Sequence, residues 1–224
     1  MIEVTEKWKE IFPNASVGVL LITNTDNPAK NSDLDIRISE VESEIRDTFS
    51  ETSRTAIREF PTIKPYVAYY RKFKKTYHVQ LQIESIAFKH RRVPRISALV
   101  SCMFAAELKN HLLTAEHDAS NIQFPMTLDV STGDESYTKI NSKKQTLSPD
   151  DMFISDPKGV ISSIIYGPDN RTSITPNSSD VLFTVYGPEG ISPPQITRHL
   201  TDINNFVNLV SPNANTELLE VISG

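Results

Sequence analysis

The segment VGVLLIT at residues 17–23 is followed directly by NTDNP at residues 24–28. The first segment is apolar and rich in β-branched side chains, which is typical of a strand that is buried on both faces. The second segment combines Asn, Asp and Pro, residues that favour turns. The sequence therefore predicts that the fold begins with a core strand that ends in a turn near Pro28.

Apolar residues recur at helical spacing after this strand. Ser39 is the predicted N-cap of a helix that ends before Pro61, because Glu42 lies three residues after Ser39 and completes a capping box. The same spacing and the positions of the prolines predict four further helices, at residues 65–75, 82–89, 97–112 and 194–209.

From Ile122 the pattern changes to short apolar runs that are separated by Gly, Pro, Asn, Asp and Ser. Such runs predict strands. The predicted strands are residues 122–130, 136–140, 152–155, 160–166 and 181–186. Helices followed by strands indicate a mixed α+β fold in which the helices cover one side of a sheet.

The composition of the 224 residues is that of a folded protein, with 38% hydrophobic and 23% charged residues. We expect a single domain over residues 1–224, in which residues 1–63 add a strand and a helix, and residues 191–224 add a helix that packs on the core. No apolar run approaches the roughly 20 residues that a membrane-spanning helix needs. The acidic start of the chain does not resemble a secretory signal. These features predict a cytoplasmic protein that does not enter a membrane.

The residue types that bind metals and cofactors are sparse. The five histidines are scattered, the glycines form no phosphate-binding loop, and the single cysteine, Cys102, lies in an apolar helical pattern. We therefore expect no metal and no cofactor, and we expect Cys102 to be a buried structural thiol. No complete catalytic constellation is visible, so the sequence leaves open whether the chain is an enzyme.

Positive charge is concentrated in one part of an acidic chain. Residues 71–95 hold eight basic residues and one acidic residue, Glu84, whereas the formal net charge of the whole chain is −5. In this segment Arg91, Arg92 and Arg95 lie on a connector between two predicted helices. RNA would be attracted to such a segment, so the three arginines are candidate RNA-binding residues. A solvated helix face explains the same charges without RNA.

A loop at residues 167–172 is a candidate ligand site. Gly167, Arg171 and Thr172 lie in this loop, where backbone amides and a guanidinium group can face an anion. These three residues are therefore predicted to bind a ligand.

The order of several weakly specific motifs is similar to that of a known family. The motifs are Val93-Pro94-Arg95-Ile96 before a predicted helix, Asp118, Gly133-Asp134-Glu135, residues 147–156, residues 159–167 and Val181-Leu182-Phe183. Over residues 64–190 this order resembles the B3/B4 domain of the phenylalanyl-tRNA synthetase β subunit, in particular its stand-alone form. The resemblance implies a three-layer sandwich of two β-sheets and a helical layer, a cytoplasmic protein, no metal and a role in tRNA synthetase biology.

In the full-length enzyme of this family, the domain has a cavity that hydrolyses tRNA carrying the wrong amino acid. The glycine of that cavity matches Gly167, whereas its histidine falls on Ala115 and its glutamate falls on Thr184. The polar side chains of the family are thus missing at two positions. His117 lies close to the vacated histidine position and is the candidate catalytic residue. The family's aspartate matches Asp118, which is a further candidate ligand-binding residue.

Three functions follow from these observations. The first is a stand-alone module that binds tRNA or an amino-acid-like ligand and does not charge tRNA by itself, because aminoacylation motifs are absent. The second is a trans-editing hydrolase that deacylates mischarged tRNA, with water activated by His117 or by the substrate. The third is a small-molecule-binding or structural protein that does not bind RNA, which the acidic net charge favours.

Overall fold

The computed structural model describes residues 1–224 and contains seven α-helices and eleven β-strands. The helices are α1 (Glu6–Ile11), α2 (Ser32–Phe49), α3 (Arg54–Arg58), α4 (Lys64–Lys72), α5 (His78–Lys89), α6 (Ala98–Asn110) and α7 (Pro193–Val210). The strands are β1 (Ile2–Val4), β2 (Ser16–Thr23), β3 (Thr114–Asp118), β4 (Met126–Val130), β5 (Ser136–Thr138), β6 (Lys144–Thr146), β7 (Met152–Asp156), β8 (Gly159–Ser163), β9 (Gly167–Pro168), β10 (Val181–Gly187) and β11 (Asn215–Ser223).

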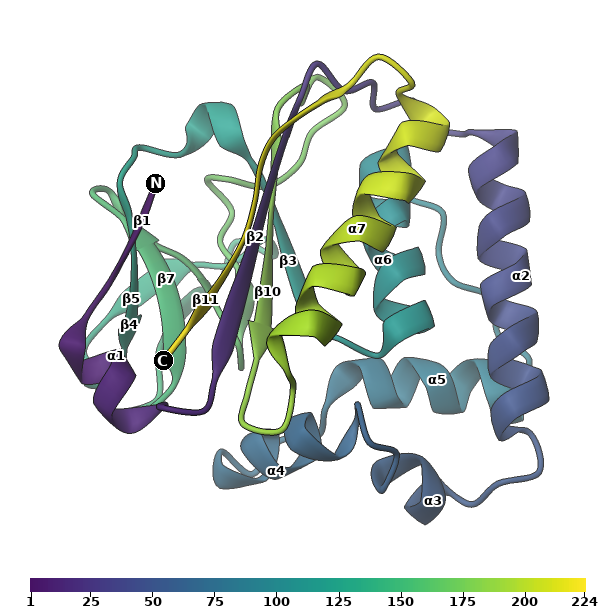
Figure 1. The fold of residues 1–224 in the computed structure, drawn as a ribbon, viewed down its shortest axis with the longest axis horizontal. Coiled ribbons are helices and arrows are strands. Elements are labelled where there is room, and N and C mark those ends of the chain that lie inside the picture. The colour runs from purple at the N-terminus through teal and green to yellow at the C-terminus, as the bar shows by residue number, and fades with distance from the viewer.

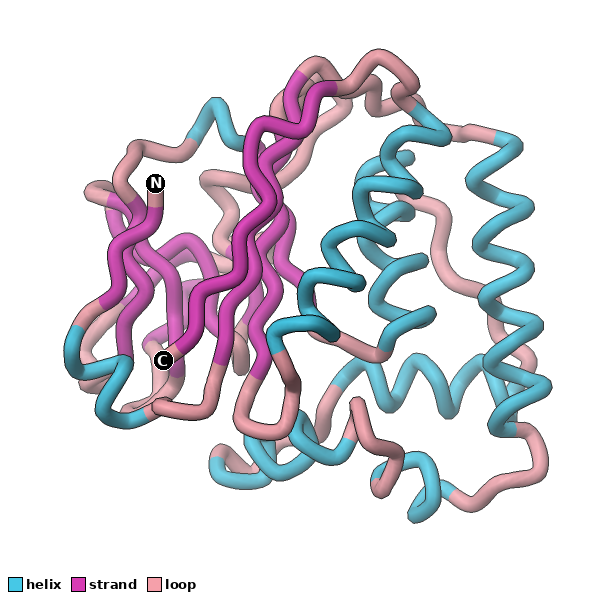
Figure 2. Tube along the Cα trace, in the orientation of Figure 1, coloured by secondary structure: helices cyan, strands magenta, loops and turns pink.

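Two larger β-sheets lie side by side, and helices cover the face of one of them (Figure 1, Figure 2). Strands β5 and β6 form a separate, antiparallel two-stranded sheet. The central sheet has the strand order β11-β2-β10-β3 and is antiparallel throughout. The outer sheet has the order β1-β4-β7-β8-β9, in which only β1 and β4 are parallel. Helices α6 and α7 pack on the central sheet, and α2 packs on α6 and α7. This arrangement confirms the α+β fold class with two main sheets and a helical layer, to which the β5-β6 pair is added.

The predicted core strand at residues 17–23 is confirmed as β2. It is paired on both sides, with β10 and with β11. Gly18 lies in this strand where α7 crosses it, and a Cβ atom at this position would stand 2.4 Å from Cγ2 of Ile196. The absence of a side chain at Gly18 therefore lets the helix approach the sheet.

The helix predicted from Ser39 to Pro61 was wrong at both ends. Helix α2 begins at Ser32, because the Asn31 side chain accepts the backbone N–H of Leu34 at 2.9 Å and caps the first turn. Ser39 lies inside the helix, where its hydroxyl donates to the carbonyl of Asp35. The helix ends at Phe49, and α3 follows as a separate short helix.

Several predicted elements are shorter or longer in the structure. The strand predicted at residues 160–166 ends at Ser163, and the one predicted at residues 122–130 begins at Met126. Helix α5 begins four residues earlier than predicted, at His78. Helix α1 and strands β1, β3, β6, β9 and β11 were not predicted. None of the helices combines the length and the apolar character that crossing a bilayer requires.

Candidate functional site

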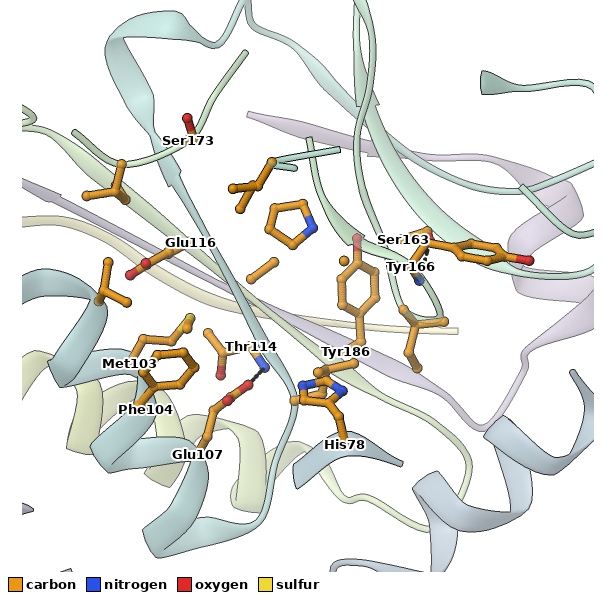
Figure 3. Close-up of a pocket in the computed structure, with 18 of the residues that line it drawn as sticks. His78, Met103, Phe104, Glu107, Thr114, Glu116, Ser163, Tyr166, Ser173 and Tyr186 are labelled. Atoms are coloured by element: carbon orange, nitrogen blue, oxygen red, sulfur yellow. Dashed lines mark hydrogen bonds between the residues drawn. The ribbon is translucent and has the colours of Figure 1, made fainter. Parts of the chain in front are cut away.

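A cavity of about 490 Å³ opens beside β3, the edge strand of the central sheet. Its walls come from one face of α6, from β3, and from the segments at residues 163–168 and 173–174 (Figure 3). Hydrophobic residues make up 13 of the 21 residues that line it. The volume and the apolar walls are those of a site for a small molecule, since such sites commonly measure about 300–1,000 Å³.

Helix α6 contributes one continuous face to the cavity. Val100, Met103, Phe104 and Glu107 all line it. Their spacing of three, four and seven residues places them on one side of an α-helix. The other sides of the helix pack against α2 and α7, so apolar residues occupy most of its circumference. Cys102 is buried in this helix, as predicted. Glu107 is therefore an acidic group in an otherwise apolar helix.

Glu107 is buried and only partly satisfied. Its Oε1 atom accepts the backbone N–H of Thr114 at 2.7 Å, whereas its Oε2 atom is buried without a hydrogen-bond partner. Burial raises the pKa of Glu107 to about 8, and the nearby charge of Glu116 adds to this rise. The Thr114 hydrogen bond opposes the rise but does not cancel it.

Glu116 is the second acidic group of the cavity. It comes from β3, and its Oε2 atom is buried without a partner. Burial raises the pKa of Glu116 to about 8. Neither lysine nor arginine lines the cavity, and burial lowers the pKa of the lining His78 to about 4. The cavity thus holds two carboxyl groups and no positive charge that balances them.

Gly167 is the one predicted ligand-binding residue that lines the cavity. Its φ angle is +77°, a left-handed conformation that favours glycine, and no atom lies within 4 Å of the place where a Cβ would stand. Its carbonyl accepts the hydroxyl of Tyr137 at 2.7 Å. The position predicted from the sequence is thus a fixed, open part of the cavity wall.

Arg171 and Thr172 do not line the cavity, because both are held by groups of the chain itself. The Arg171 guanidinium donates two hydrogen bonds of 2.9 Å to the carboxylate of Asp156. The Thr172 hydroxyl donates to Asp169 and also contacts Nδ1 of His117 at 2.7 Å. Direct contact of Arg171 and Thr172 with a ligand stays a prediction.

Asp118, the remaining ligand-binding candidate, caps η1 (Ala119–Asn121) and lies outside the cavity lining. Its carboxylate accepts the backbone N–H of Ser120 at 3.0 Å and the hydroxyl of Ser178 at 2.5 Å. The structure gives Asp118 a local role in the β3 to η1 turn, and its contact with a ligand stays a prediction.

His117, the candidate catalytic residue, is fully buried and does not line the cavity. Side chains alternate along β3, so His117 points to the opposite side of the strand from Glu116. Burial lowers the pKa of His117 to about 3, and its Nε2 atom has no hydrogen-bond partner. An imidazole with this pKa is neutral at physiological pH. Its catalytic role stays a prediction.

Ala115 and Thr184, the two positions that the resemblance matched to polar residues, lie opposite each other. Ala115 on β3 pairs with Thr184 on β10. Ala115 lines the cavity, whereas the Thr184 hydroxyl is buried without a partner. Glu116 follows Ala115 directly on β3.

The three candidate RNA-binding arginines differ in exposure and in their ion pairs. Arg95 is half-buried and bridges two carboxylates of α2, with 2.9 Å to Asp35 and 3.4 Å to Glu42. Arg91 and Arg92 are exposed, and their guanidinium groups form no ion pair or hydrogen bond within the chain. Arg91 and Arg92 remain available to a partner, whereas Arg95 anchors the connector.

Sequence reasoning missed both carboxyl groups of the cavity. Glu107 carried a usable signal, because it is a single acidic residue within the apolar helical run at residues 98–108. Glu116 carried none, because the segment TAEHD at residues 114–118 does not alternate between apolar and polar residues. No group of three or more His, Cys, Asp or Glu side chains in the structure could hold a metal ion.

Comparisons with known proteins add one structural likeness. No protein-family model matches the sequence, and no curated protein matches it. Among solved structures, an N-terminal fragment of the phenylalanyl-tRNA synthetase β subunit from Pyrococcus horikoshii aligns with a TM-score of 0.49 and 12% sequence identity. The alignment covers 99% of this chain and 50% of that chain, so this chain spans about half the length of that fragment.

Proposed function

We propose that this protein is a binding module for an amino-acid-like small molecule, with the ligand's apolar body in the cavity and its ammonium group beside Glu116 and Glu107. The observation that carries the proposal is the presence of two buried carboxyl groups without a positive partner in a cavity with apolar walls. An unpaired buried carboxylate is costly, and a bound cation removes that cost. A ligand with an ammonium group fits this cavity better than one with an anionic group.

The test compares two ligands that differ in charge. Phenethylamine and 3-phenylpropionate share an aromatic body, and only the first carries an ammonium group. We expect phenethylamine to bind, with an affinity that rises between pH 6 and about 8, because the carboxyl groups must lose protons with a pKa of about 8 before they pair with the cation. Isothermal titration calorimetry measures both affinities.

A matched pair of variants assigns the binding to the cavity. Glu116→Gln should weaken phenethylamine binding about tenfold or more, since a hydrogen bond to a charged group contributes about 1.5–3 kcal/mol. Glu220→Gln removes the same charge from the exposed strand β11 and should leave binding unchanged. If 3-phenylpropionate binds more tightly than phenethylamine at low pH, the ligand carries an anionic group and not the proposed ammonium group. Absence of binding by both compounds and by their aliphatic analogues would reject the proposal.

RNA is a second candidate partner. The observation that favours it is that Arg91 and Arg92 are exposed and have no acidic partner. If RNA binds there, the affinity should fall steeply with salt, with a slope of about −0.7 per phosphate contact for a single strand. Arg91→Ala/Arg92→Ala should make this slope shallower by the equivalent of about one to two phosphate contacts. Arg58→Ala/Arg198→Ala, which removes two exposed arginines elsewhere, should not change it. Binding that does not depend on salt would contradict an RNA partner.

A further inference from the structure

A second, smaller pocket of about 290 Å³ lies next to the ligand cavity. Ile96 and Phe104 belong to the walls of both pockets, so the two spaces adjoin. Ile96 is 61% exposed, and Phe104 lies on the cavity face of α6 (Figure 3). The side chains that stand between the two pockets are therefore apolar.

Arg91 and Arg92 line the second pocket. Their guanidinium groups are unpaired, whereas Arg95 in the same connector is held by Asp35 and Glu42. Glu42 also accepts the backbone N–H of Val93 at 2.8 Å. These contacts fix the connector to α2, so the two free arginines stand on an anchored segment. Such pre-organisation lowers the entropy that binding costs.

A further polar group of this pocket has no partner within the chain. The Oε1 atom of Gln82, which lines the pocket from α5, is buried and forms no hydrogen bond. A side-chain amide can turn either its oxygen or its NH₂ group toward a ligand. Gln82 therefore offers a neutral polar contact beside the two arginines.

We propose that the natural ligand is dipolar, with an ammonium group at Glu116 and Glu107, an apolar middle over Phe104 and Ile96, and a phosphate or carboxylate group at Arg91 and Arg92. This proposal rests on the proposed function, because the ammonium end occupies the same cavity. One end of the site holds two carboxyl groups and the other holds two guanidinium groups, and apolar side chains lie between them. A molecule with one charge uses only half of it, and guanidinium groups bind carboxylate and phosphate through paired N–H donors.

The test uses compounds with one aromatic body and different ends. Tyramine carries the ammonium group and a neutral phenol. Its phosphate ester and 4-(2-aminoethyl)benzoate carry the same ammonium group and an anionic group at the far end. Analogues with one and two extra methylenes before the anionic group vary the separation between the ammonium and the anionic group. Calorimetry at low ionic strength measures each affinity. Comparison of the phosphate ester with the benzoate shows whether the arginines prefer phosphate or carboxylate.

We expect at least one dipolar compound to bind about tenfold more tightly than tyramine. Arg91→Ala/Arg92→Ala should abolish this gain and leave tyramine binding unchanged. Arg58→Ala/Arg198→Ala, which removes the same total charge from other exposed positions, should retain the gain. Both double variants replace exposed side chains, and thermal melts verify that they are folded.

Three results would overturn the proposal. In the first, tyramine binds but no dipolar compound of any length binds more tightly, which leaves the proposed function intact. In the second, both double variants lose the gain equally, so that it reflects only overall charge. In the third, phenyl phosphate binds as tightly as the dipolar compounds and Glu116→Gln has no effect on them, so that the arginine pocket acts alone. Failure of tyramine itself to bind would instead reject the proposed function.

Discussion

The carboxyl group of Glu116 is buried beside an apolar cavity, and burial raises its pKa from 4.5 to about 8. In the unfolded chain this group loses its proton near pH 4.5. Between these two pH values the folded state retains a proton that the unfolded state has released. A rise in pH therefore favours unfolding in this window, and the full penalty is present above about pH 8.

Replacement of Glu116 by Gln should remove its share of this pH dependence. Gln has the same shape and cannot ionise, so the variant should be more stable than the wild type at pH 9 by on the order of 1–4 kcal/mol. Near pH 4.5 the two proteins should be similar in stability. Urea unfolding at several pH values measures the difference. Burial also raises the pKa of Glu107 to about 8 and of Asp151 to about 7, so the wild type alone does not isolate Glu116.

The control for this prediction is Glu220→Gln, which changes an exposed carboxyl group on β11. Its stability relative to the wild type should not depend on pH in the same window. A Glu116→Gln variant that is equally destabilised at pH 5 and pH 9 would mean that the carboxyl group is not buried in its neutral form.

At the residue scale, the sequence located the cavity by one residue, Gly167, and missed the carboxyl groups inside it. A glycine before a proline is visible as a turn in any context. The pKa of a glutamate depends instead on what covers it, and the cover of Glu116 comes from α6 and from distant loop segments. Likewise, Arg171 has a guanidinium group suited to an anion, but Asp156 occupies it.

At the element scale, the contact between β2 and α7 depends on Gly18. Gly18→Ala would place a methyl group 2.4 Å from Cγ2 of Ile196 and 3.0 Å from Cδ1 of Leu200. The helix or the strand must shift to relieve this overlap, so we expect a loss of about 1–3 kcal/mol in the free energy of unfolding. Chemical denaturation of the two proteins measures it.

A double-mutant cycle separates this overlap from any general effect of the alanine. In an Ile196→Ala background, Cγ2 is absent and space is free beside residue 18. The added cost of Gly18→Ala should therefore be smaller than in the wild type, with a coupling of about 0.5–3 kcal/mol. Equal costs in both backgrounds would show that Ile196 does not press on Gly18.

Elements with a clear period could be predicted, and elements without one could not. Residues 17–23 and 194–209 correspond to β2 and α7, whose apolar patterns match their burial. Strand β3 was missed because all five of its residues are buried although four of them are polar or charged. Strand β11 was missed because a bulge between Thr216 and Leu218 interrupts its register and most of its residues are exposed.

At the scale of the whole molecule, 52 buried hydrophobic residues form one contiguous cluster that runs from Trp8 to Val210. The central sheet explains this continuity, because β3 and β10 lie within residues 64–190, whereas β2 and β11 come from the parts of the chain before and after them. We propose on this basis that residues 1–224 fold as one domain. The division into a core at residues 64–190 with additions at both ends stays a prediction.

A fragment of residues 64–190 should not fold by itself. It would keep β3 and β10 but lose β2 and β11, and with them half of the central sheet. It would also lose α7, which packs on β2 and α6, and α2 beyond it. We expect the isolated fragment to lack cooperative unfolding when it is followed by circular dichroism.

The full chain should instead unfold in a single transition, and two probes at opposite sides of the molecule can test this. Trp8, the single tryptophan, is fully buried in α1, which packs on β4 of the outer sheet. Far-ultraviolet circular dichroism reports mainly on the helices, most of which lie on the other side of the central sheet (Figure 1). If one core joins the layers, fluorescence and circular dichroism should give the same midpoint in urea. Two separate midpoints would mean that the outer sheet and the helical layer unfold independently, and would contradict a single domain.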